Sequence, residues 1–369
     1  MLVSIILQEM TKLSLFEKTI TSIKPLYGAT IKREWEKIDN LTKPIGSLGS
    51  LEDIAAKISG ITGKTNNKIN KKNIIIMCAD NGVIAEGVST NPQKTTAIVT
   101  NNFTKHITGV CVLAKHANSE ITVVDVGVNA DFDNKDILNK KIAYGTKNIA
   151  VEAAMTRDEA IRAIEAGIET VNELVLSGCD LLGTGEMGIG NTSTSAAVLS
   201  VLSGIDSDLV VGKGSGLTKP QYENKKSVIK RAIDVNSPDK NDIIDILSKV
   251  GGFDIAALCG CFLAAASSRV PIVIDGFISA AAALCAYRIN PLTRDFMFPS
   301  HLSAEPGAIY MMKELKLEPM LNLNMRLGEG SGCPLAFNII EAALYTINNM
   351  ATFEQAELVK GCYVDIRKE

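Results

Sequence analysis

Short apolar runs alternate along the chain with longer stretches whose apolar residues recur at helical spacing. Six such runs occur, at residues 74–78, 121–124, 180–182, 271–274, 296–298 and 320–325. Strands that alternate with helices are typical of α/β proteins, in which the sheet is mainly parallel. The pattern therefore predicts an α/β fold: a Rossmann-like, mainly parallel sheet with flanking helices.

Each of these runs ends in polar or glycine-rich residues. The polar groups that follow them are Asp80, Asp125, Glu186, Asp275, His301 and Glu329. The carboxyl ends of parallel strands lie on one edge of a sheet, where the ligands of open α/β sheets bind. We therefore expect side chains from six distant segments to surround one cleft.

The two ends of the chain lie outside this alternation and have helical spacing, at residues 1–40 and 338–361. The apolar run at the N-terminus lacks the basic start and the cleavage site of a signal peptide, and is interpreted as one face of a helix. We expect residues 1–40 and 338–369 to form a small helical domain. Residues 41–337 are then expected to form the large α/β catalytic domain.

Composition narrows the class of protein. Of the 369 residues, 46% are apolar and 21% are charged, with a net charge of -3, which favours neither a nucleic-acid partner nor an anionic membrane. No uncharged run is long enough to span a membrane. The eight cysteines form no CxxC pair, so we expect buried, reduced thiols and a cytoplasmic protein. His106, His116 and His301 lack ligand spacing, so no metal site is expected.

A glycine-rich stretch at 183–192 joins a predicted strand to a predicted helix at 193–202. Glycines let backbone N–H groups approach an anion closely, and a helix N-terminus adds positive charge. Thr192 or Ser193 can cap that helix. The stretch predicts either a phosphate-binding turn or a glycine turn packed tightly under a helix. Glu186 within it would repel an anion and suits a ribose hydroxyl better.

A second stretch, at 326–332, carries a carboxylate between glycines. Glu329 follows an apolar run and precedes another apolar segment. Desolvation in such surroundings would raise its pKa toward the range that is useful to a general base. A solvated turn carboxylate is the alternative, and spacing does not decide between them.

Hydroxyls and lysines elsewhere offer phosphate ligands. Ser300 and Ser303 can donate to phosphate oxygens, and Lys213 or Lys225 can neutralise a phosphate. Neighbouring residues of a strand face opposite sides of the sheet. We therefore do not expect Ser300 to bond His301 as the pair of a hydrolase would.

Seven motifs together resemble a known family over nearly the whole chain: KPIGSLG at 43–49, CADNGV at 78–83, GEMGIGNT at 185–192, KVGGFD at 249–254, DGF at 275–277, SHLSAE at 300–305 and RLGEGSG at 326–332. The chain resembles the nicotinate-nucleotide–dimethylbenzimidazole phosphoribosyltransferases of cobamide synthesis. The resemblance implies transfer of the phosphoribosyl group of nicotinate mononucleotide to an aromatic lower-ligand base. The products are an α-riboside 5'-phosphate and nicotinate, and no cofactor is implied.

The resemblance also implies roles for residues. Glu329 is implied as the general base, and Glu186 as a group that assists at the ribose. The implied nucleotide and phosphate site comprises Gly188, Ile189, Gly190, Asn191, Lys225, Ser303 and Gly276. The implied acceptor pocket comprises Asp80, Asn91, Val99 and Leu327. The family works as a dimer, so a homodimer or a heterodimer with a homologous chain is expected.

Departures from the family pattern leave the acceptor open. Asn81 stands where the family usually has a histidine. Asn91 and Val99 stand where benzimidazole-using members have a serine and a glutamine, and loss of the glutamine makes the pocket more apolar. Some relatives activate phenol or p-cresol, as a heterodimer of homologous chains. Either dimethylbenzimidazole or a phenol is therefore expected as acceptor.

Two other interpretations stay open. A nucleotide-dependent oxidoreductase needs an acidic residue on a second strand, about twenty residues beyond the glycine loop. Asp206 and Asp208 lie near that spacing. A non-catalytic homologous subunit of a heterodimer is the other interpretation, and retention of Glu329 argues against it.

Overall fold

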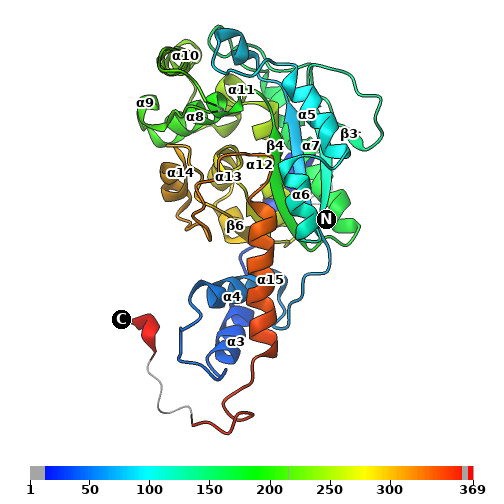
Figure 1. The fold of residues 1–369 in the computed structure, drawn as a ribbon, viewed down its shortest axis with the longest axis vertical. Helices are drawn as coiled ribbons and strands as arrows, with labels where there is room; N and C mark the ends of the chain where they lie inside the picture. The colour runs from blue at the N-terminus through cyan, green and yellow to red at the C-terminus, as the bar shows by residue number, and fades with distance from the viewer. Residues whose placement is uncertain (1–12, 215, 360–364, 369) are drawn as a thin grey trace, which may run out of the picture.

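The structure is a computed structural model that describes residues 13–214, 216–359 and 365–368. Six strands form one sheet in the order β3-β2-β1-β4-β5-β6, and all neighbouring strands are parallel (Figure 1). This is a doubly wound strand order, so the predicted Rossmann-like sheet is confirmed. The strands are β1 (Lys72–Ala79), β2 (Glu120–Gly127), β3 (Ile137–Asn139), β4 (Leu181–Met187), β5 (Ile272–Ile274) and β6 (Met297–Pro299).

Five of the six apolar runs form strands, and the prediction for the sixth was wrong. Residues 320–325 stay outside the sheet beside the end of β6, where the Leu321 N–H donates to the Ser300 carbonyl oxygen at 3.0 Å. Asn324 has a left-handed φ of 55°, which interrupts the extended backbone that a strand requires. The sixth strand is instead β3, a three-residue edge strand.

Helices cover both faces of the sheet (Figure 1). The helices α12 and α13 pack against one face, and α5, α6 and α15 pack against the other. These are α5 (Thr95–Thr104), α6 (Gly109–His116), α12 (Phe253–Ser267), α13 (Phe277–Ile289) and α15 (Cys333–Asn349). The remaining helices of the sheet-bearing part are α7 (Arg157–Leu176), α8 (Asn191–Ser203), α9 (Ser207–Val210), α10 (Lys219–Asn236), α11 (Ile243–Val250) and α14 (Ala308–Leu315).

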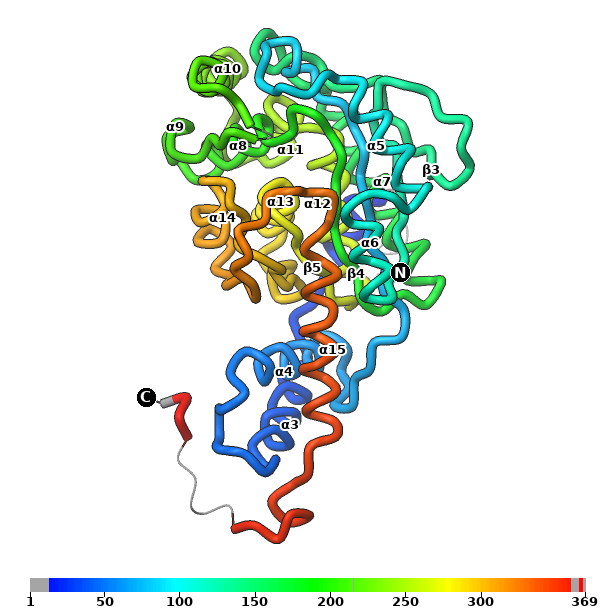
Figure 2. The backbone as a smooth tube through the Cα atoms, in the orientation of Figure 1, coloured from blue at the N-terminus to red at the C-terminus, as the bar shows by residue number. Residues whose placement is uncertain are grey.

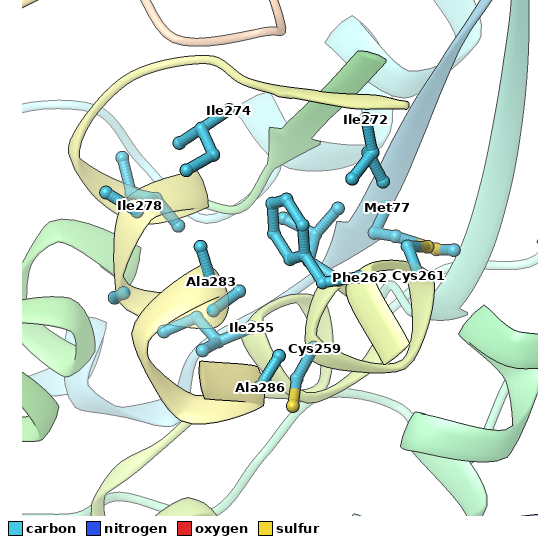
Figure 3. Close-up of a cluster of buried hydrophobic side chains, with 14 of the residues drawn as sticks. Met77, Ile255, Cys259, Cys261, Phe262, Ile272, Ile274, Ile278, Ala283 and Ala286 are labelled. Atoms are coloured by element: carbon cyan, nitrogen blue, oxygen red, sulfur yellow. The ribbon is translucent and has the colours of Figure 1, made fainter. Parts of the chain in front are cut away.

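The core between the sheet and α12 and α13 is apolar. In Figure 3, Phe262 of α12 lies beside Ile272 of β5, with Met77 of β1 nearby, and each of these side chains is fully buried. Burying each such side chain contributes roughly 1.5–3 kcal/mol. Cys259 and Cys261 belong to this cluster. All seven described cysteines are buried and free, as predicted, and Cys362 lies outside the described residues.

The helices α7 and α12 cross so closely that only glycine fits at the contact. A Cβ atom at Gly167 would lie 1.9 Å from the carbonyl oxygen of Ala257, and one at Gly260 would lie 1.9 Å from that of Ile164. The close crossing fixes α12, and through α12 it fixes the central strands.

A helical unit lies beyond one end of the sheet-bearing part, where α3 (Gly28–Ile38), α4 (Ser50–Thr62) and the far end of α15 pack together (Figures 1 and 2). The short helix α2 (Leu15–Ser22) packs instead against α7 and α12. Because α4 packs with α3 and α15, it groups with the predicted small domain although it lies within 41–337. The division of the chain at residues 40 and 41 stays a prediction.

The C-terminal helical segment was predicted too long. The helix α15 begins at Cys333, with Pro334 in its first turn, and ends at Asn349 where Met350 becomes extended. Proline is well suited to a first turn because its missing N–H has no partner there. Thr352 forms an isolated bridge with Leu41, and turns follow over residues 353–357. The predicted N-terminal helix at residues 1–10 lies outside the described residues, and no described helix is long and apolar enough to cross a membrane.

Candidate functional site

A cavity of about 870 Å³ lies at the carboxyl edge of the sheet. It adjoins β4, which neighbours β1 at the point where the strand order reverses, and ligands of doubly wound sheets bind at that point. Its volume is in the range of small-molecule sites. The cavity is lined by parts of the segments 88–99, 186–192, 212–216, 275–279, 301–306 and 326–329.

The cavity brings together most of the residues that sequence implied. Those that line it are Glu329, Glu186, Gly188, Ile189, Gly190, Asn191, Ser303, Gly276, Asn91, Val99 and Leu327. Lys225 and Asp80 are not among the lining residues. Of the six polar groups expected around one cleft, four line the cavity, Glu186, Asp275, His301 and Glu329, whereas Asp80 and Asp125 do not.

The glycine turn leads into α8 without a side-chain cap. Gly190 is the N-cap residue, with a left-handed φ of 98°, so the predicted caps at Thr192 and Ser193 are wrong. A Cβ at Gly188 would lie 2.4 Å from the Ala79 carbonyl oxygen, which explains the need for glycine there. The uncapped start of a helix that borders a cavity is suited to an anion.

A buried cation lies next to this turn. The Lys225 side chain is 1% exposed, and its Nζ donates to Thr192 Oγ1 at 2.8 Å. Burial lowers the pKa of Lys225 to about 8, and Glu305 opposes this in part. Among the described residues no carboxylate lies within ion-pair distance of Lys225. The alternative, Lys213, borders the cavity but is exposed to solvent.

Glu329 reaches the cavity from a tight loop and is held by α6. Its Oε2 accepts the N–H of Val110, in the first turn of α6, at 3.1 Å. Burial raises the pKa of Glu329, while hydrogen bonds from Val110, Gly109 and Thr108 lower it in part. Of the two alternatives that the spacing left open, the structure therefore has the desolvated carboxylate. A carboxylate of this kind is suited to accept a proton near neutral pH.

Glu186 stands at the end of β4 with a side chain that is 6% exposed. Its Oε2 accepts from Asn191 Nδ2, and its Oε1 accepts the Glu329 N–H at 3.4 Å. Burial raises the pKa of Glu186 to about 8, and the neighbouring Asp254 raises it further. The Asn191 amide also donates to Asp254 Oδ2 at 3.1 Å. The side chain of Asn191 is therefore turned toward carboxylates.

Ser300 and His301 are in contact, contrary to the prediction. Ser300 Oγ and His301 Nδ1 lie 3.0 Å apart. The alternation of strand faces does not apply to them, because β6 ends at Pro299. Burial lowers the pKa of His301.

Asp80 lies away from the cavity, although the resemblance implied it in the acceptor pocket. Its Oδ2 accepts the Asn129 N–H at 2.8 Å, so it bonds the backbone that follows β2. Burial raises its pKa. The other implied pocket residues do border the cavity, and Leu327 is 58% exposed.

Sequence reasoning missed three groups. Asp254 contacts Glu186 through Asn191, and the segment Thr108–Val110 holds the Glu329 carboxylate. Asp275 was noted only as a strand end, yet it contacts the Glu329 loop. Only Thr108, a residue type favoured at helix N-caps, offered a local signal.

The acidic residue that a dinucleotide-dependent oxidoreductase needs is not on a strand. Asp206 is the N-cap of α9 and accepts the Asp208 N–H at 2.9 Å. Both residues are therefore accounted for by a short helix, and the oxidoreductase interpretation is not supported.

The uncapped start of α8 and the desolvated carboxylates Glu186 and Glu329 border one cavity, and the buried Lys225 bonds Thr192 of its lining. This is the arrangement of an α/β enzyme suited to acid–base chemistry on a phosphorylated substrate. Comparison with known proteins makes this specific. A family model described as Phosphoribosyltransferase matches residues 23–358, and the chain belongs to that family.

Known relatives match this chain over nearly its full length. The nicotinate-nucleotide–dimethylbenzimidazole phosphoribosyltransferase of Clostridium tetani is 58% identical, over 97% of this chain and 99% of the relative. The protein of that name in Clostridium acetobutylicum is 56% identical, over 93% and 97%. The crystal structure of CobT from Thermus thermophilus is similar with a TM-score of 0.87, at 35% identity, covering 90% of this chain and 100% of that one. The protein is a phosphoribosyltransferase.

Proposed function

We propose that the protein transfers the phosphoribosyl group of nicotinate mononucleotide to an aromatic lower-ligand base of a cobamide. The observation that carries this proposal is that Glu329 and the glycine turn at 188–192 border one cavity. A base and an anion site that share a cavity of about 870 Å³ leave room for a nucleotide and an aromatic acceptor. The names of the relatives state the same chemistry for those proteins.

The 5'-phosphate binds at the start of α8. The donors are backbone N–H groups of the glycine turn and the Ser303 hydroxyl. Gly276 lies beside Ser303. The Lys225 ammonium supplies the charge, since it is buried without an ion pair among the described residues. A phosphate would stabilise the charged form of this lysine and offset its burial.

The bond that breaks joins the ribose C1 to the nicotinate ring nitrogen. That nitrogen is cationic in the substrate and keeps the bonding electron pair, so nicotinate leaves without protonation. Positive charge then develops at C1. Glu186 stands at the end of β4 to stabilise it, because a nearby cation favours the ionised form of a carboxyl group whose pKa burial has raised.

The bond that forms joins C1 to the acceptor, which attacks from the face opposite the departing ring and gives the α-riboside. Glu329 takes the acceptor proton, from a ring N–H of dimethylbenzimidazole or from a phenolic O–H. A positioned base contributes roughly a hundred- to ten-thousandfold in rate. Orientation of the two substrates supplies up to ~7–11 kcal/mol.

The acceptor is dimethylbenzimidazole or a phenol. The names of the relatives favour the first. Val99 borders the cavity and offers no hydrogen bond to an azole ring, which supports the second. Asn91 and Leu327 complete this side of the cavity.

Incubation with nicotinate mononucleotide and dimethylbenzimidazole, phenol or p-cresol, in separate reactions, tests the proposal. We expect release of nicotinate and formation of an α-riboside 5'-phosphate with at least one acceptor. Turnover of dimethylbenzimidazole alone would exclude the phenol alternative. Failure of all three to react, in the presence of intact substrate and folded protein, would contradict the proposal.

Several apolar side chains are exposed, and one of them, Leu327, borders the cavity. Ile98, Ile107, Val112 and Leu327 are apolar and between 53% and 65% exposed. We propose that a second copy or a homologous chain covers them in a dimer, and that the protein works in the cytoplasm, where its buried thiols stay reduced. Sedimentation of the purified chain, with and without a co-expressed homologue, distinguishes a homodimer from a heterodimer.

A further inference from the structure

The loop that carries Glu329 has a backbone that requires support. Gly328, Glu329 and Gly330 have φ angles of 81°, 65° and 97°, so three consecutive residues adopt the left-handed region. That region is unfavourable for a glutamate. Within the loop, the Ser331 N–H donates to the Gly328 carbonyl oxygen at 3.0 Å. Contacts with the rest of the fold must therefore help to hold Glu329 in this conformation.

The Asp275 carboxylate makes such contacts. Its Oδ2 accepts the Gly330 N–H at 3.1 Å, and its Oδ1 accepts the Gly332 N–H at 2.7 Å. Asp275 is 3% exposed, and no lysine or arginine of the described chain forms an ion pair with it. A buried carboxylate whose two oxygens bind N–H groups of one loop restrains that loop strongly.

Asp275 is itself fixed by its neighbours. Its N–H donates to Ser279 Oγ at 3.2 Å, and its carbonyl oxygen accepts from Ser300 Oγ at 2.9 Å. Because the Ser300 hydroxyl hydrogen is used there, Ser300 Oγ is assigned as the acceptor of the His301 Nδ1–H. A Cβ at Gly332 would lie 2.3 Å from His301 Nδ1, so the loop backbone packs directly on this cluster.

We propose that Asp275 is a positioning residue for Glu329. Asp275 borders the cavity, but both of its carboxylate oxygens are engaged by the loop, so it acts through the backbone of Gly330 and Gly332 rather than on the substrate. The proposal rests on the proposed function, in which Glu329 accepts the proton of the acceptor. A displacement of a reacting group by about 1 Å can cost ~100-fold in rate, so the position of this loop matters.

The substitution Asp275→Asn tests the proposal. An amide of the same shape presents one acceptor and one donor, so one of the two loop N–H groups loses its partner. We expect kcat to fall roughly 10- to 100-fold, the effect of losing one hydrogen bond to a charged group. The KM for nicotinate mononucleotide should stay close to wild type, since the turn at 188–192 and Lys225 are untouched.

Asp125→Asn is a matched control. Asp125 is also a buried strand-end carboxylate, and its Oδ1 also accepts two backbone N–H groups, from Gly127 and Val128. It does not line the cavity. We expect this variant to keep the wild-type kcat whatever it does to the melting temperature.

Combining Asp275→Asn with Glu329→Gln in one protein distinguishes a positioning role of Asp275 from general damage to the fold. If Asp275 acts through Glu329, Asp275→Asn should add little loss to the Glu329→Gln variant. The inference would be overturned if Asp275→Asn lowered kcat by the same factor in the wild-type protein and in the Glu329→Gln variant. It would also be overturned if Asp275→Asn kept the wild-type kcat while Glu329→Gln was impaired. If Asp275→Asn does not fold, the same comparison is made with Ser300→Ala, for which we expect a smaller loss of kcat. Absence of transfer by the wild-type protein would instead refute the proposed function.

Discussion

In the half of the carboxyl edge of the sheet formed by β1 and β2, the strand-end carboxylates bond nearby backbone and do not line the cavity. Asp125 accepts the N–H groups of Gly127 and Val128 and pairs with Lys141 at 2.7 Å, and Asp80 bonds the Asn129 N–H. In the half formed by β4 and β5, Glu186 borders the cavity and Asp275 holds a loop 55 residues away in sequence.

Asp125 differs from Glu186 and Asp275 in the compensation of its charge. Asp125 has a lysine partner, whereas among the described residues neither Glu186 nor Asp275 has a lysine or arginine within ion-pair distance. Burial raises the pKa of Glu186 to about 8 and that of Asp275 to about 7. A strand-end position therefore does not by itself indicate function, whereas a buried carboxylate without a cation beside a cavity does.

The largest expected effect is that of Glu329→Gln. The amide keeps an oxygen for the Val110 N–H but cannot accept a proton, so kcat should fall roughly 100- to 10,000-fold with little change in melting temperature. Nicotinate release measures it. A comparable loss of kcat in Asp125→Asn would break the distinction between the two halves.

Lys225→Met and Lys141→Met compare the cations of the two halves. Lys225→Met removes the charge expected to bind phosphate, so kcat/KM for nicotinate mononucleotide should fall roughly 10- to 100-fold. Lys141→Met leaves buried Asp125 without its partner and should cost ~3 kcal/mol of stability with kcat/KM retained. Steady-state kinetics and urea unfolding of both variants are the measurements. Equal losses of kcat/KM and of stability in the two variants would contradict these different roles of Lys225 and Lys141.

The stability of the Glu186→Gln variant relative to the wild type should increase as pH rises. The pKa of Glu186 is about 8 in the fold against an ordinary value of 4.5, so the unfolded chain ionises first and wild-type stability falls between about pH 4.5 and 8. Glutamine does not titrate, so the difference in favour of the variant should grow across that window, to on the order of 3 kcal/mol. Urea unfolding at pH 5 and pH 8.5 tests this; a difference that is the same at both pH values would refute it.

Gly109→Ala should have the smallest effect, and it concerns the segment of the β1–β2 connection that holds the Glu329 carboxylate. A Cβ at Gly109 would lie 2.5 Å from Leu327 Cδ2 and 3.3 Å from Glu329 Oε2. Since the exposed Leu327 can move aside, kcat/KM for the acceptor should fall by less than about tenfold. Gly28→Ala, where nothing lies within 4 Å, is the control and should change nothing.

Much of the fold followed from local pattern. Alternating apolar runs predicted five of the six strands, because buried parallel strands are continuous apolar segments. The short edge strand β3 offered too few residues for such a signal, and the run at 320–325 had the signal but is broken at Asn324. The end of α15 at Asn349 likewise had no glycine or proline to mark it.

The candidate site was predictable only where residues adjoin a strand end. The position of Glu186 at that edge followed from this rule. Glu329 follows the run at 320–325, which is not a strand of the sheet, so a strand end does not account for its place at the cavity. The contacts of Asp275 with Gly330, and of Glu329 with Val110, join segments 55 and 219 residues apart, and no local pattern encodes them. The choice of Lys225 over Lys213 came from resemblance, since only the fold reveals which lysine is buried.

The buried groups Lys225 and Glu186 affect how tightly the substrate and the products bind. Nicotinate mononucleotide carries an anionic phosphate, which pairs with Lys225, and a cationic ring nitrogen, which favours the ionised form of Glu186; its ring carboxylate is a further negative charge. An α-riboside 5'-phosphate of a benzimidazole or a phenol keeps the phosphate but has an uncharged aglycone, and free nicotinate brings only a negative charge toward Glu186. Each product therefore lacks the cationic ring nitrogen that favours the ionised form of Glu186, which weakens its binding relative to the substrate and favours its departure after each turnover.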